Sequence, residues 1–100
     1  MTSDEKANIG QVCLTVVVYG RVQGVGFRYY TQSSALRHGV MGWVRNNYNG
    51  TVEIHAEGSA ESLNAFLAKV RSGPTGAHVS KVDVQWGSSK GRYRDFRIRS

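Results

Sequence analysis

Residues 20–28 read GRVQGVGFR and lie between an apolar run at residues 12–19 and a helix-compatible run at residues 29–38. This order predicts a strand, a glycine-rich turn and the start of a helix. The glycines permit left-handed backbone angles and let an anion approach main-chain N–H groups closely. The first turn of the helix adds unpaired N–H groups and the positive end of its dipole. Arg28 adds a planar cation whose paired donors match phosphate or carboxylate oxygens, so the stretch predicts an anion-binding loop.

The spacing of these glycines separates the loop from two well-known nucleotide motifs. No Gly-Lys-Ser/Thr follows at the spacing found in the phosphate loop of nucleotide hydrolases. In the dinucleotide fingerprint a third glycine would follow Gly24 and Gly26, but Tyr29 stands at that position. On glycine content alone, a tight strand-to-helix turn with a solvated arginine explains residues 20–28 as well as an anion site does.

Four blocks of the sequence resemble the acylphosphatase family. The longest, GRVQGVGFR, resembles the family signature G-R-V-Q-G-V-x-F-R, with glycine at the variable position. The resemblance implies a ferredoxin-like fold and an enzyme that hydrolyses the carboxyl–phosphate bond of acyl phosphates to carboxylate and inorganic phosphate. It implies neither a metal nor an organic cofactor. The other blocks are GWVRN at residues 42–46 with NGTV at residues 49–52, Gly73-Pro74 followed by Val79 and Val82, and FRIR at residues 96–99.

The resemblance also implies which residues form the active site. Arg28 and Asn46 would be catalytic and would face a shared site, with Arg28 on the phosphate and Asn46 aiming the attacking water. The adjacent Asn47 would point the opposite way in a strand, and Asn46 is preferred because it directly follows WVR of the second block. The substrate phosphate, or inorganic phosphate or sulfate in its place, would be bound by the backbone N–H groups of Val22, Gln23, Gly24, Val25, Gly26 and Phe27.

No general base stands near either block. An acyl phosphate is a mixed anhydride with a good leaving group, so positioning and charge stabilisation can supply most of the rate. The phosphate itself can accept the proton of the water. Tyr48, in the turn near the expected site, is an extra aromatic that could alter the preferred acyl group.

Composition sets the broad class of protein. One hundred residues make one domain that can bury a core of its own. Residues 1–10 are polar and lack the apolar region of a signal peptide, and no apolar run approaches the about 18 residues of a membrane span. We therefore expect a flexible N-terminal segment at residues 1–10, a domain at residues 11–100, a cytoplasmic location and a monomer. The single cysteine, Cys13, cannot form an internal disulfide, and we expect it to be buried as a small apolar residue.

Hydrophobic periodicity predicts the order of the elements. Ser59 is expected to cap the second helix, and Glu53, His55 and Glu57 alternate with apolar residues on a solvent-facing side of their strand. The order β-α-β-β-α-β plus a short terminal strand predicts an α+β ferredoxin-like sandwich, an antiparallel sheet with two helices on one face. Strands are predicted at residues 12–19, 40–46, 51–57, 77–86 and 93–99, and helices at residues 27–38 and 59–72.

A net charge of +6 favours anionic partners in general and does not choose among them. RNA-recognition domains share the predicted order of elements, but their specific contacts need aromatic side chains on the third strand. Residues 52–57 offer no aromatic residue and include two carboxylates, so we expect no nucleic-acid partner. We expect Trp43 and Trp86 to pack within the protein rather than to stack on a ligand.

Two further possibilities stay open at this point. The chain could be an acylphosphatase-like domain such as those at the start of hydrogenase-maturation carbamoyltransferases, although it reaches Ser100 with a single domain. It could also be a catalytically silent anion sensor, although it retains both Arg28 and Asn46. The three histidines, His38, His55 and His78, lack the spacing of metal ligands, so we expect no zinc site.

Overall fold

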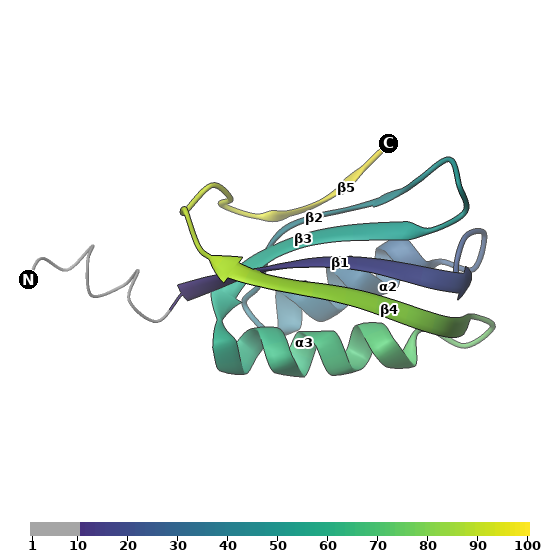
Figure 1. Ribbon diagram of the computed structural model, residues 1–100, viewed down its shortest axis with the longest axis horizontal. Helices are drawn as coiled ribbons and strands as arrows, with labels where there is room; N and C mark the ends of the chain where they lie inside the picture. Colours follow the sequence, from purple (N-terminus) through teal and green to yellow (C-terminus); the bar gives the residue numbers. More distant parts are fainter. Residues whose placement is uncertain (1–10) are drawn as a thin grey trace, which may run out of the picture.

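The protein is represented by a computed structural model in which residues 11–100 are described, so the segment predicted at residues 1–10 lies outside the described residues. Two helices lie side by side on one face of a five-stranded sheet, and the other face of the sheet is open (Figure 1). The elements are, in chain order, β1 (Gln11–Arg21), α2 (Phe27–Arg37), β2 (Met41–Asn46), β3 (Val52–Ser59), α3 (Ala60–Ser72), β4 (His78–Ser88) and β5 (Phe96–Arg99). Within residues 11–100, no helix has both the length and the apolar character needed to span a bilayer.

The strand order is β4-β1-β3-β2-β5, which confirms the predicted ferredoxin-like sandwich. The pairs β1–β3, β1–β4 and β2–β3 are antiparallel as predicted. The last pair, β2–β5, is parallel, so the prediction of a purely antiparallel sheet is wrong at this edge. The reason is topological: β4 ends at the end of the sheet where β2 begins, so the strand that follows it must run in the direction of β2.

Strand β1 is an interior strand of the sheet, between β4 and β3, and it carries apolar residues on both of its faces. Its inward residue Leu14 lies opposite Ala56 of β3 and opposite Trp86 of β4. The buried face of α3, formed by Leu63, Phe66, Leu67 and Val70, packs against this layer. Phe66 meets Phe96 of β5 edge-on at 5.9 Å between ring centroids. The fully buried side chains include Leu14, Val16, Val18, Phe27, Val44, Val52, Ile54, Leu63, Phe66 and Val70.

Three side chains differ from expectation in their exposure. Cys13 was expected to be buried but is only partly buried, because it lies on the face of β1 opposite to the buried Leu14. Glu57 was expected on the solvent-facing side of β3, yet only 6% of it is exposed, because residues 89–92 fold over it. Its carboxylate accepts hydrogen bonds from the Ser89 hydroxyl and from the backbone N–H groups of Lys90 and Arg92, at 2.9 to 3.0 Å. Trp86 was expected to pack but is 47% exposed, because it lies near the end of the edge strand β4.

Candidate active site

The loop between β1 and α2 takes a backbone path that its glycines allow. Gly24 and Gly26 have φ of 75° and 76°, in the left-handed region that L side chains rarely adopt. A methyl group added at either position would meet no atom within 4 Å. The glycines are therefore needed for the backbone angles, and the space beside them is open to a ligand.

The N-cap of helix α2 is Gly26, whose carbonyl accepts the first helical hydrogen bond from the N–H of Tyr30 at 3.0 Å. Within residues 11–100, no side chain caps this terminus, and the first turn of α2 contains no acidic residue. Arg28 lies in that first turn and is half-buried. The N–H groups that precede the helical ladder and the positive end of the helix dipole thus face the same region as a guanidinium group.

Asn46 completes this region from the sheet. It is the last residue of β2 and has the same strand parity as Val44, which is fully buried under the helices, so it points to the side of the sheet where α2 lies. One hollow of about 200 Å³ brings it together with Arg28 and the loop. The residues that line this hollow are Val22, Gly24, Gly26, Phe27, Arg28, Tyr29 and Asn46.

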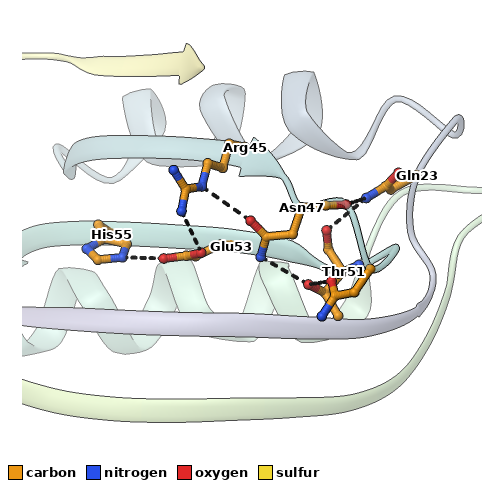
Figure 2. Close-up of polar contacts among 7 residues, drawn as sticks. Gln23, Arg45, Asn47, Thr51, Glu53 and His55 are labelled. Carbon is orange, nitrogen blue, oxygen red and sulfur yellow. Dashed lines mark hydrogen bonds and ion pairs between the residues drawn. The ribbon is translucent and has the colours of Figure 1, made fainter. Parts of the chain in front are cut away.

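The neighbouring Asn47 has other partners. Its side-chain oxygen accepts a hydrogen bond from Arg45 at 3.2 Å, and its side-chain nitrogen donates to the Thr51 hydroxyl at 3.1 Å (Figure 2). Asn47 is thus held within the 47–51 turn, whereas Asn46 lines the hollow. This geometry distinguishes the two asparagines that the sequence places side by side.

Gln23 does not line the hollow, but its side chain ties the loop to the turn that follows Asn46. Its amide nitrogen donates to the carbonyl oxygens of Asn47 at 2.8 Å and Thr51 at 2.9 Å (Figure 2). Val25, also predicted among the binding residues, packs partly buried against the core. The sequence predicted only a backbone role for Gln23 and no role for Tyr29, which lines the hollow. Gln23 is the one amide side chain in a glycine-rich loop, and this could have indicated a role for its side chain.

The open face of the sheet beside the site carries a network of charges. Glu53 accepts hydrogen bonds from Arg45 at 3.2 Å and His55 at 2.7 Å (Figure 2). Burial by itself would raise the pKa of Glu53, but the hydrogen bonds from His55, Asn47 and Arg45 outweigh it and lower that pKa. Arg45 is thereby engaged on the face opposite Asn46. In the part of the chain that the structure describes, no cluster of three or more His, Cys, Asp or Glu side chains could hold a metal ion.

Comparison with known proteins identifies the family of this chain. Residues 14–98 match the family model described as Acylphosphatase. An acylphosphatase of Dehalococcoides mccartyi is 48% identical over 88 residues, which cover 87% of this chain and 97% of that protein.

Solved structures give the same result. The crystal structure of acylphosphatase from Bacillus subtilis matches with a TM-score of 0.86 and 37% identity, covering 89% of this chain and 99% of that one. Full-length HypF is also similar, with a TM-score of 0.83 and 27% identity, but the match covers 90% of this chain and only 12% of HypF. With most of its length matched by a family model and by relatives of similar size, the chain belongs to the acylphosphatase family, whose enzymes hydrolyse acyl phosphates.

Proposed function

We propose that the chain hydrolyses acyl phosphates in the hollow at the start of α2, with Arg28 and the loop holding the phosphate and Asn46 positioning the water. One observation carries this proposal: a single hollow joins an uncapped helix N-terminus, an arginine and a strand-end amide. The first two features suit a phosphate dianion. The third supplies a group that can both donate and accept a hydrogen bond.

In the binding step, the phosphate lies against the backbone N–H groups of residues 22–27, with the Arg28 guanidinium contacting its oxygens. The left-handed angles of Gly24 and Gly26 shape this part of the backbone. Gln23 holds the loop against the 47–51 turn, which directly follows Asn46 in the chain. We therefore regard Gln23 as a positioning residue, which keeps the phosphate loop and Asn46 at a fixed separation.

In the chemical step, the water oxygen held by Asn46 forms a bond to phosphorus. The bond between phosphorus and the carboxyl oxygen breaks, and its electron pair leaves with the carboxylate. The proton of the water passes to a phosphate oxygen, so the products are a carboxylate and inorganic phosphate. A carboxylic acid has a pKa of about 4, so its anion leaves readily and positioning with charge stabilisation is enough.

This mechanism limits the range of substrates. An alkyl phosphate ester presents the same phosphate but a far poorer leaving group. It would therefore bind to the site, but its turnover would be very slow. No step uses a metal ion. Action as a monomer in the cytoplasm stays a prediction, as does an influence of Tyr48 on the preferred acyl group.

The proposal is tested by the hydrolysis of benzoyl phosphate in the presence of a metal chelator. Arg28→Gln should raise KM and lower kcat, whereas Asn46→Ala should lower mainly kcat, by about a hundred-fold or more. Arg37→Gln, which removes a charge from the last turn of α2, is the matched control and should behave as the wild type. A folded wild type that binds phosphate without hydrolysing benzoyl phosphate, or one that rapidly hydrolyses phosphomonoesters, would contradict the mechanism.

A further inference from the structure

We propose that the open face of the sheet carries a second anion site, which binds a small molecule with two or more phosphate groups. The site is a hollow of about 320 Å³ between β2, β5 and the segment that connects β4 to β5. Its volume lies at the lower end of the range usual for small-molecule sites. The residues that carry the argument are Trp43, Arg92, Arg94, Asp95, Arg97 and Arg99, all of which line it.

The charge of this lining is strongly positive. Four arginines and one aspartate line the hollow, so its formal charge is 4 − 1 = +3, half of the net +6 of the whole chain. Asp95 is paired with Arg97 at 2.9 Å. Within residues 11–100, the side chains of Arg92, Arg94 and Arg99 form no ion pair.

The parallel edge of the sheet brings a further cation, Arg45, next to Arg99 of this hollow. Arg45 of β2 and Arg99 of β5 are in register, and both guanidinium groups lie over the Trp43 ring, at 5.0 and 4.7 Å from its centroid. His55 stacks on the same ring at 4.2 Å between centroids. Like charges on directly opposed residues normally destabilise a sheet. Glu53 compensates Arg45, but Arg99 is held in place by the ring with its donors still available.

These features suit a compact polyphosphate better than a single phosphate. A guanidinium group matches phosphate oxygens with paired donors, and orthophosphate carries too little charge to balance a lining of +3. A diphosphate or triphosphate group balances it. A nucleic-acid strand is a poorer match, because crossing the open face from this hollow over β2 would take it past the carboxylate of Glu53 on β3.

This second site is separate from the hollow that contains Arg28. No residue lines both hollows. Arg45 and Asn46 are neighbours in β2 and therefore point to opposite faces of the sheet. Binding of a polyphosphate at the second site therefore does not depend on hydrolysis in the hollow that contains Arg28.

The test is a titration with inorganic tripolyphosphate, monitored by Trp43 fluorescence and by calorimetry. The sequence contains two tryptophans, so Trp86→Phe leaves Trp43 as the sole reporter, and this variant serves as the parent. We expect one tripolyphosphate to bind at this site and to change the emission of Trp43. The double variant R97Q/R99Q should weaken this binding by about ten-fold or more, because it removes two charge-assisted contacts.

Three controls separate binding at this site from binding in the Arg28 hollow and from a general attraction to the basic surface. Arg28→Gln should leave the Trp43 response unchanged, because Arg28 belongs to the other hollow. The double variant R37Q/R71Q removes the same charge from the two helices and should also leave it unchanged. Orthophosphate should produce the response only at concentrations about ten-fold higher or more.

Four outcomes would overturn the proposal. The wild type could fail to bind tripolyphosphate, or the Trp43 response could disappear in Arg28→Gln. The R37Q/R71Q control could weaken binding as much as R97Q/R99Q, which would indicate an unspecific effect of net charge. Finally, a single-stranded oligonucleotide could bind where tripolyphosphate does not, which would make this face a nucleic-acid surface instead.

Discussion

The N-cap of helix α3 is a serine whose side chain accepts a hydrogen bond from the first turn, whereas the N-cap of α2 is a glycine, which has no side chain. Ser59 Oγ accepts from the N–H of Ser62 at 3.0 Å. At the start of α2, Gly26 adopts a left-handed φ of 76° and offers no such acceptor. The two helices pack on the same face of the same sheet, so the difference lies in what each N-terminus is free to bind (Figure 1).

The charges in the first turns of the two helices differ in the same sense. Glu61 in α3 interacts favourably with the positive end of its helix dipole. Arg28 in α2 places a cation where the dipole disfavours one. A bound anion would reverse that unfavourable interaction and satisfy the open N–H groups as well. The chain closes the N-terminus of α3 by itself and leaves that of α2 to a ligand.

The surroundings of Glu57 also differ from the loop before α2 in what occupies a group of converging backbone N–H groups. Backbone N–H groups of Lys90 and Arg92 converge on its carboxylate, as those of residues 22–27 are proposed to converge on a phosphate. In one place the chain carries the anion itself, and in the other the anion is the substrate. A substitution in the loop before α2 should therefore mainly lower activity, whereas a substitution of Glu57 should mainly lower stability.

The largest expected effect separates the two ends of α2. Gly26→Ala and Gly39→Ala both force an L side chain into a left-handed angle, φ 76° and 65°, with open space around the new methyl group. Each should lower the free energy of unfolding by about 1 to 2 kcal/mol. Only Gly26→Ala should also lower kcat/KM for benzoyl phosphate, by about a hundred-fold, because it moves the backbone N–H groups of the loop at residues 22–27. Equal activity of the two variants would show that the geometry at Gly26 serves folding alone.

The second prediction concerns the filled site at Glu57. Glu57→Gln should lower the free energy of unfolding by about 1 to 3 kcal/mol near neutral pH, because the N–H groups of Lys90 and Arg92 lose a charged acceptor that is itself buried. Chemical unfolding with urea measures the difference. Glu61→Gln, which changes an exposed carboxylate of α3, is the matched control and should have a far smaller effect.

The contribution of Glu57 to stability should decrease as the pH falls. Burial alone would raise the pKa of Glu57, but hydrogen bonds from Lys90, Ser89 and Arg92 outweigh it and lower that pKa in the folded state. The stability from this group is therefore complete above the unfolded pKa of about 4.3 and is lost as the pH falls through the folded-state pKa. The stability difference between the wild type and Glu57→Gln should shrink between about pH 6 and about pH 3. A difference that stays constant over this range would exclude the ionised carboxylate as its source.

Features set by neighbouring residues could be predicted from the sequence. The glycines of the loop, the Ser59 cap and the alternation of β3 depend on local backbone preferences, and the structure confirms the first two and the alternation from Val52 to Ala56. The burial of Glu57 could not be predicted, because it depends on N–H groups 33 and 35 residues further along the chain. Alternation alone placed that carboxylate in solvent.

The candidate site divides in the same way. Arg28 and its loop could be identified from the signature, but the bonds from Gln23 to carbonyl groups 24 and 28 residues away depend on how the hairpin folds back. The pairing of Arg45 with Arg99 over Trp43 required the parallel strand β5, which an expectation of antiparallel strands could not contain. Contacts between distant segments are thus where the sequence pattern fell short.

The smallest expected effect concerns the N-terminus of α3, which Ser59 caps. Ser59→Ala removes the acceptor for the N–H of Ser62 and should lower the free energy of unfolding by about 1 kcal/mol. It should leave kcat/KM unchanged, because α3 contributes no residue to the hollow around Arg28. Ser62→Ala keeps the N–H that is capped and is the matched control for loss of a hydroxyl group. If Ser59→Ala lowered activity as strongly as Gly26→Ala at comparable stability, the N-termini of the two helices would be coupled, and the assignment of ligand binding to α2 alone would fail.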